Sequence, residues 1–188
     1  MKQILWIDAC ARQNSRTRLL AQKVLEKLDG RVTERNLYRE QLFPLEWEQV
    51  ERRGRCVAAG DLSAPLLQYA TEFAAADEIV VAAPYWDLSF PAILKVYFEH
   101  VTITGVTFRY SPEGIPIGLC RAKRLFYVTT AGGPIAGRNL GFDYVKVLAA
   151  AFYGIPQVRC FQAENLDIQG ADAAGILQQA IDALPEKL

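Results

Sequence analysis

Three short apolar runs along the chain have the pattern of buried strands. Ile4–Ile7, Ile79–Ala83 and Leu125–Thr129 have the length of strands and are rich in β-branched and aliphatic residues. Each run ends in a loop, and a segment with helical spacing of apolar residues follows it. This rhythm predicts βαβ units, in which a helix connects two parallel strands.

Between these runs, apolar residues recur at intervals that place them on one face of a helix. Leu20, Val24 and Leu28 follow this spacing after the first run, and Asp29-Gly30 supplies a stop. The other expected helices are Leu66–Ala76, Pro91–Val101 with Ser89 as its cap, Phe142–Tyr153 and Ala171–Leu184, and the other expected strands are Arg31–Leu37 and Val158–Gln162.

Five strands alternating with helices predict an α/β fold with a doubly wound, mainly parallel sheet and helices on both faces. Two segments depart from this pattern and are expected to be long loops: Tyr38–Gly60, which is rich in charge, and Gly105–Leu119, which is rich in proline and glycine. No repeat, linker or low-complexity tract interrupts the chain. Residues 1–188 are therefore predicted to form a single domain.

The composition of the chain argues against nucleic acid and membranes as binding partners. Lys and Arg number 21, as do Asp and Glu, so no excess of charge would attract nucleic acid or a membrane surface. No apolar run approaches the roughly 20 residues that span a bilayer, and no secretory cleavage site is visible, so we expect a soluble, cytoplasmic protein. The four cysteines are scattered and have no histidine beside them, which argues against a zinc site or a disulfide framework.

In a doubly wound fold, ligands bind where the loops at the carboxyl ends of the strands meet. The loop Asp8–Thr17 leads into the first helix, whose free amide groups and positive dipole end favour a phosphate. Ser15 and Thr17 can add hydroxyl donors. Arg12 or Arg16 can add positive charge. An ordinary helix cap with surface arginines would show the same pattern.

Two further loops could meet a flat ring system. Tyr85 and Trp86 follow the second apolar run, where they can border such a ring or form the rim of the core. The paired Gly132 and Gly133 follow the third run and let the backbone approach a ligand, although a turn would also explain them. Arg138-Asn139 stands where a P-loop would have lysine and a hydroxyl residue, and there is no GxGxxG fingerprint.

Several strings of residues resemble those of one enzyme family. Ala83–Trp86 is followed by Leu94-Lys95 and Tyr97-Phe98, and then by the string GVTFRY at Gly105–Tyr110. Together they resemble FMN-dependent NADH azoreductases and the related NAD(P)H quinone reductases, over most of the chain. The GVTFRY string is the most specific of them.

The resemblance implies a flavodoxin-like homodimer with FMN near the subunit interface. FMN would accept a hydride at N5 from NADH or NADPH and pass two electrons to a quinone or azo acceptor in a ping-pong sequence. Because the flavin carries the chemistry, no catalytic side chain is required. The residues assigned by the resemblance are Ser15, Arg16 and Thr17 at the phosphate, Tyr85, Trp86, Asp87 and Leu88 along the isoalloxazine, and Thr130, Ala131, Gly132 and Gly133 completing the site.

Two positions depart from the azoreductase pattern. Azoreductases often carry a serine early in the first loop, where this chain has Ala9 or Cys10. They commonly have an arginine and a histidine around the Gly-Gly turn, where this chain has Ala131–Ile135. The second difference bears on which class of electron acceptor the protein uses, and less on whether it binds flavin.

The first loop also fits a different enzyme class. Cys10 and Arg16 are separated by five residues and followed by Thr17, as in the Cys-x5-Arg-Ser/Thr phosphate loop of low-molecular-weight tyrosine phosphatases. In such an enzyme Cys10 would be a thiolate nucleophile and Arg16 would clamp the phosphoryl oxygens. The chain contains no Asp-Pro, the usual setting of the general acid in that class.

Two non-catalytic alternatives share the fold. A flavodoxin-like electron carrier is typically strongly acidic, whereas this chain is formally neutral. A receiver-type signalling module needs a phosphoacceptor aspartate at the end of the central strand, where this chain has Pro84. His100, the only histidine, is expected to be structural, with substrate contact at a dimer cleft as its alternative role.

Overall fold

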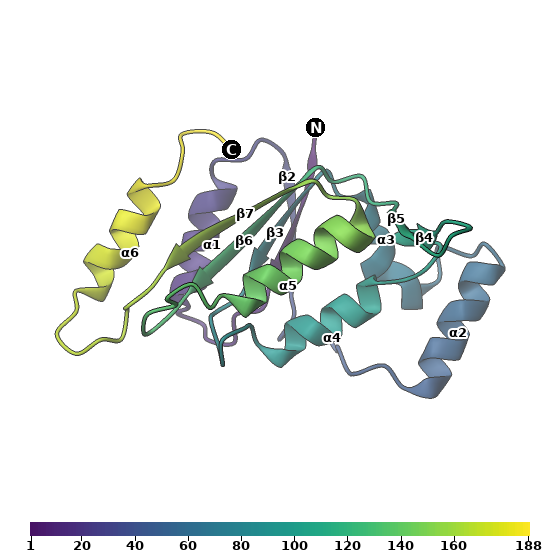
Figure 1. Cartoon of the computed structure of the whole chain (residues 1–188), viewed down its shortest axis with the longest axis horizontal. Helices are drawn as coiled ribbons and strands as arrows, with labels where there is room; N and C mark the ends of the chain where they lie inside the picture. The colour runs from purple at the N-terminus through teal and green to yellow at the C-terminus, as the bar shows by residue number, and fades with distance from the viewer.

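The computed structural model describes residues 1–188, and its centre is a five-stranded parallel sheet (Figure 1). The strands are β1 (Gln3–Asp8), β2 (Arg31–Asn36), β3 (Glu78–Ala82), β6 (Arg124–Thr130) and β7 (Gln157–Ala163). They lie in the order β2-β1-β3-β6-β7, and every neighbouring pair is parallel. The doubly wound α/β fold expected from the apolar runs is confirmed.

Helices cover both faces of the sheet (Figure 1). One face carries α1 (Arg16–Leu25) and α6 (Ala173–Asp182), and the other carries α3 (Gln68–Ala75), α4 (Ala92–Val101) and α5 (Leu140–Leu148). A strand between two helical layers must be apolar on both sides, which explains the continuous apolar runs.

Alternate residues of β1 divide the core into two layers. Leu5 and Ile7 belong to the larger apolar cluster, under α3, α4 and α5, whereas Ile4 and Trp6 belong to the cluster under α1 and α6. Successive side chains of a strand point to opposite faces, so each layer takes every second residue. The central strands are held from both sides, and the loops that follow them leave the sheet from a rigid support.

The expectation of a long loop over Tyr38–Gly60 is wrong, because its second half forms helix α2 (Trp47–Ala58). Glu46 and Gln49 form a reciprocal capping box at its start. The apolar positions of α2 are few and Gly54 interrupts them, so the sequence resembles a charged loop. No residue of this helix is buried, and it projects from the body of the molecule (Figure 1).

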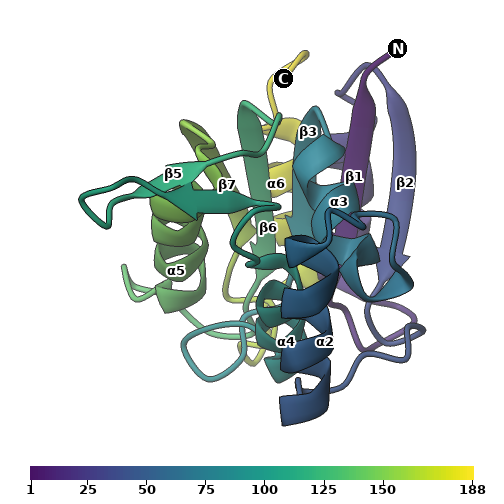
Figure 2. The same ribbon diagram turned by 90° about the vertical axis from the view of Figure 1, so that its right-hand side faces the viewer.

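The second expected loop, Gly105–Leu119, contains an antiparallel hairpin of β4 (Phe108–Tyr110) and β5 (Pro116–Gly118). Each strand has three residues, too few for alternation to be recognised in the sequence. The hairpin packs beside the end of α5 (Figure 2), where a Cβ on Gly118 would lie 2.1 Å from the backbone nitrogen of Gly154. Only glycine permits backbones to approach so closely.

Some helix ends also differ from expectation. Ser89 does not cap α4, because Pro91 occupies the N-cap position. The expected helix Leu66–Ala76 begins with the 3₁₀ turn η1 (Pro65–Leu67), which leads into α3. Helix α5 continues into a π-helical turn, η2 (Ala149–Tyr153). None of the helices combines the length and the apolar character that crossing a membrane requires.

Candidate active site

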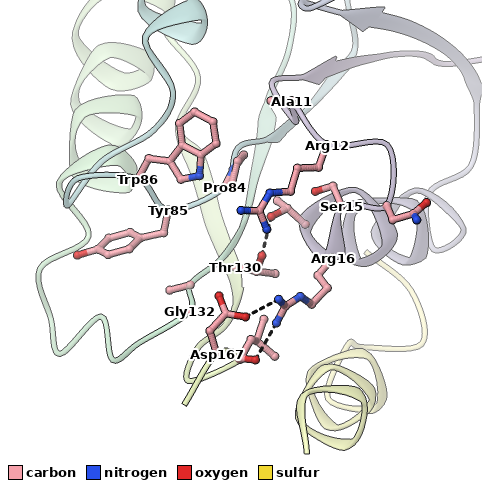
Figure 3. A pocket seen from close by; sticks show the side chains of 14 residues that line it. Ala11, Arg12, Ser15, Arg16, Pro84, Tyr85, Trp86, Thr130, Gly132 and Asp167 are labelled. Carbon is pink, nitrogen blue, oxygen red and sulfur yellow. Dashed lines mark hydrogen bonds and ion pairs between the residues drawn. The ribbon is translucent and has the colours of Figure 1, made fainter. Parts of the chain in front are cut away.

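An open pocket of about 220 Å³ lies at the carboxyl edge of the sheet, where the loops after β1, β3 and β6 meet (Figure 3). The chain order of the strands reverses between β1 and β3, the place where doubly wound folds bind their ligands. The expected site residues that line the pocket are Ser15, Arg16, Thr17, Tyr85, Trp86, Thr130, Ala131 and Gly132. Asp87, Leu88 and Gly133 lie outside the lining.

Ser15 begins the first helix at the edge of this pocket. Its Oγ accepts the amide N–H of Arg18 at 3.3 Å, while its own hydroxyl hydrogen remains free to donate. The amide N–H groups of Arg16 and Thr17 have no acceptor within the protein. Together with the positive end of the helix dipole, these donors suit a phosphate.

Thr17 and Thr130 connect the first helix to β6. Their hydroxyl oxygens lie 2.6 Å apart, and Thr17 is fully buried. One hydroxyl donates to the other, which leaves a single hydroxyl hydrogen of the pair for a ligand. The contact therefore holds the start of α1 against the end of β6 and closes the bottom of the pocket.

The two arginines of the first loop differ in their partners. Arg16 donates from Nη1 to the carbonyl of Leu166 at 2.8 Å and from Nη2 to Asp167 Oδ1 at 2.5 Å. Arg12 makes no hydrogen bond or ion pair, and its guanidinium points into the pocket in Figure 3. The loop thus provides one neutralised and one unpaired arginine.

The loop after β3 is a tight turn with Trp86 at its base. Trp86 N–H donates to the carbonyl of Ser89 at 3.1 Å, and Ser89 N–H donates back at 2.7 Å. Asp87 and Leu88 form the tip, with φ of 49° and 67°, as the central residues of a type I′ turn require. Tyr85 and Trp86 border the pocket, and the tip extends past it.

The loop after β6 presents backbone donors. The amide N–H groups of Gly132 and Gly133 have no acceptor within the protein. A Cβ on Gly132 would lie 2.5 Å from Asp167 Oδ2, so glycine leaves room for the loop that follows β7. Free donors at this side and at the start of α1 fit a ligand with a phosphate at one end and a ring bearing acceptors at the other, as in FMN.

Sequence reasoning missed the loop that follows β7. Leu166 and Asp167 line the pocket, and their amides donate to the carbonyls of Ala131 and Gly132 at 3.2 and 2.8 Å. The signal was present, because a loop after the strand beside β6 must emerge at the same edge of a parallel sheet. Ala11, Arg12, Asn14 and Pro84 complete the lining.

Cys10 does not have the environment of a phosphatase nucleophile. It is buried and outside the pocket lining, and its backbone N–H donates to Asp8 Oδ1 at 2.9 Å. Burial, and then the negative charge of Asp8, raise the pKa of the Cys10 thiol far above its ordinary value. Arg16, the expected phosphoryl clamp, is already paired, so the phosphatase hypothesis is wrong.

His100 has a structural role, as expected. Its Nε2 lies 2.8 Å from the carbonyl oxygen of Phe43, and its ring packs edge-on against Tyr69. The side chain is buried and does not line the pocket. The histidine therefore holds the segment before α2 against α4.

Comparison with known proteins identifies relatives of the whole chain. Residues 2–188 match a family model described as a flavodoxin-like fold. FMN-dependent NADH:quinone oxidoreductase 2 of Clostridium acetobutylicum is 34% identical, with 100% of this chain and 98% of that protein covered. An FMN-dependent NADH:quinone oxidoreductase of Lachnoclostridium phytofermentans is 36% identical over 92% of this chain and 90% of its own length.

Solved structures share the fold at lower identity. An azoreductase from Bacillus anthracis has a TM-score of 0.82 at 23% identity, covering 97% of this chain and 96% of that one. An FMN-dependent NADH-azoreductase of the same species, in complex with FMN, has a TM-score of 0.78 at 20% identity, covering 97% and 95%.

Proposed function

This chain belongs to the flavodoxin-like family that includes the FMN-dependent NADH:quinone oxidoreductases, and we propose that it is an FMN-dependent NAD(P)H oxidoreductase with a quinone or azo acceptor. The observation that carries this proposal is the meeting of three loops at one pocket, two of them with unpaired backbone donors, beside the point where strand order reverses. When bound, FMN supplies the transfer of a hydride from NADH or NADPH and of two electrons to the acceptor.

The start of α1 binds the phosphate end of the cofactor. The hydroxyl of Ser15 and the amides of Arg16 and Thr17 are the donors, and the helix dipole adds to their attraction. Arg16 contributes through its backbone, since its guanidinium is held by Leu166 and Asp167.

The other two loops hold the ring. When FMN is bound, Tyr85 and Trp86 would border its flat face, and the amide of Gly132, with that of Gly133 next to the lining, would donate to acceptors on the ring and stabilise the negative charge that grows there on reduction. Thr130 and Ala131 form the wall between them. Asp87 and Leu88 remain predicted contacts at the tip of the turn. The protein orients the ring and limits the access of water, and no side chain acts as acid or base.

A second copy of the chain completes the site. About 220 Å³ is less than the roughly 300–1,000 Å³ of most cofactor pockets, so one chain encloses only part of a flavin. Leu140, Tyr144 and Val147 expose an apolar stripe on α5, and the amide of Leu140 donates to the carbonyl of Leu88 at 3.1 Å. A copy docked on this stripe would lie beside the turn that carries Trp86, and the acceptor would enter between the two subunits.

Light scattering tests the homodimer. The native chain is expected at twice its monomer mass, and Val147→Asp is expected to shift it toward the monomer and to weaken FMN binding. A native chain that is monomeric with FMN bound would contradict the shared site.

Two broader proposals accompany the function. A single FMN-binding domain over residues 1–188 is supported by the two core layers, which share one sheet.

A cytoplasmic location is supported by the four cysteines, none of which forms a disulfide. Cell fractionation with an antibody to the chain tests the location.

The decisive experiment is a visible spectrum of the chain after incubation with FMN and gel filtration. A retained flavin spectrum that bleaches with NADH under anaerobic conditions, and returns on addition of a benzoquinone or an azo dye, is the expected result. The proposal would be refuted if the chain retained no flavin. It would also be refuted if the bound flavin stayed oxidised after addition of NADH and of NADPH.

A further inference from the structure

Arg12 is the one arginine of the pocket that has no internal partner. It is exposed, makes no hydrogen bond or ion pair, and points its guanidinium into the pocket in Figure 3. A guanidinium that serves the fold is normally paired, as Arg18 is with the buried carboxylate of Asp8. Arg12 therefore contributes nothing visible to the fold.

The charge balance of the pocket points to an anionic ligand group. Its charged lining residues are Arg12, Arg16 and Asp167. Arg16 and Asp167 neutralise each other through a contact of 2.5 Å, which leaves the charge of Arg12 uncompensated. A phosphate monoester carries about −1.5 to −2 charges at neutral pH. It would be placed by the free amides at the start of α1, within the same pocket as this guanidinium.

We infer that Arg12 selects flavins that carry the phosphate ester, by a charged hydrogen bond from its guanidinium to the phosphate oxygens, and that the side chain of Arg16 does not. This inference rests on the proposed function. Arg16 instead positions the loop after β7, through Leu166 and Asp167, against the wall of the pocket. The two arginines, four positions apart in the sequence, thus have different tasks.

Comparison of FMN with riboflavin isolates the phosphate. The full-length chain, freed of flavin by dialysis against concentrated potassium bromide, is titrated with each flavin while quenching of flavin fluorescence is followed. Arg12→Ala is expected to raise the Kd for FMN about ten- to hundredfold and to leave the Kd for riboflavin unchanged. Arg12→Lys should recover part of the loss, since the charge returns without the forked geometry.

Arg16→Ala is the matched control. It removes the same charge from the same loop, and it is expected to weaken FMN and riboflavin binding by the same factor, because the wall of the pocket loosens for both. Added salt should weaken the binding of FMN to the native chain more than to Arg12→Ala.

Equal losses for FMN and riboflavin in Arg12→Ala would overturn the inference, as would an FMN-selective loss confined to Arg16→Ala. A native chain that binds FMN no better than riboflavin would also overturn it, while leaving the oxidoreductase proposal intact. If the native chain bound neither flavin, the proposed function would fall first and the role of Arg12 with it.

Discussion

At the amino ends of the central strands the charged side chains pair with one another, whereas at the carboxyl ends several donors have no partner inside the protein. Glu78 at the start of β3 is buried between Lys2 and Arg124, with its Oε1 2.7 Å from Lys2 Nζ. Next to it, Asp77 accepts the amide of Gln3 at 2.7 Å. The charged side chains at this end of the sheet thus pair with one another, and only Glu78 Oε2 is buried without a hydrogen-bond partner.

The carboxyl end differs because several of its hydrogen-bond donors have no acceptor within the protein. The amides of Arg16, Thr17, Gly132 and Gly133 and the guanidinium of Arg12 have no acceptor in the chain. Unpaired donors are tolerated where water or a ligand reaches them, as in an open pocket. Paired charges occur at both ends, since Arg18 pairs with Asp8 at the carboxyl end. The difference teaches that the unpaired donors identify the end of the sheet that serves binding.

Breaking the amino end should damage folding and leave binding alone. Glu78→Gln removes the buried charge that Lys2 and Arg124 share, and it is expected to lower the free energy of unfolding by about 2 kcal/mol, because charged hydrogen bonds are lost. Urea denaturation measures this loss, and a fluorescence titration should give the native Kd for FMN. Glu26→Gln, at an exposed pair with Lys23, is the control, with an expected loss below about 0.5 kcal/mol. A large change in FMN affinity for Glu78→Gln would break the comparison.

High pH should destabilise the fold through buried thiols. Burial raises the pKa of Cys120 to about 12, and burial with the charge of Asp8 raises the pKa of Cys10 further. In the unfolded chain a thiol loses its proton near about pH 8.5, so above that pH the unfolded state binds fewer protons and stability falls. Below that pH this contribution is fully present.

The expected loss is about 1 kcal/mol per buried cysteine between about pH 8.5 and 9.5. Urea denaturation at these two pH values measures it, before the tyrosines of the unfolded chain titrate appreciably. The double variant Cys10→Ala with Cys120→Ala should show a shallower decline than the native chain. An identical decline in both proteins would contradict the assignment to these thiols.

Removing one donor at the carboxyl end should affect binding more than folding. Ser15→Ala deletes a hydroxyl that lines the pocket at the proposed phosphate position, and FMN affinity is expected to fall about tenfold. The lost cap bond to Arg18 should cost about 1 kcal/mol of stability. Asp172→Ala, which removes the cap of α6 outside the pocket, should cost similar stability and leave the Kd for FMN unchanged. Equal affinities for the two variants would remove Ser15 from the site.

The smallest expected effect comes from a buried residue of the same loop that does not line the pocket. Cys10→Ser should leave the rate of NADH-driven quinone reduction unchanged, because the thiol is buried and its Sγ lies 3.8 Å from the carbonyl oxygen of Ala82. Steady-state assays of FMN-loaded native and variant protein measure the rate. A variant without activity that still folds and binds FMN would restore Cys10 to the mechanism.

Much of this fold can be read from the chain because its strongest signals are local. The apolar runs of β1, β3 and β6 and the helical spacing after them are patterns of near neighbours, and they predict the βαβ order and the edge where ligands bind. Short or polar elements escape such reasoning. The three-residue strands of the β4–β5 hairpin are too short to show a period, and the few apolar residues of α2 lie among many charged ones.

The sequence by itself determined the doubly wound fold and the three loops that meet at the pocket, because helix spacing, strand length and the start of α1 depend on neighbouring residues. Only the tertiary structure decided which arginine is free. Arg16 finds its partners, Leu166 and Asp167, 150 and 151 positions away, and they reach it only because β7 pairs with β6 at the same edge. The packing of distant segments thus assigns different tasks to two side chains of the same kind in one loop.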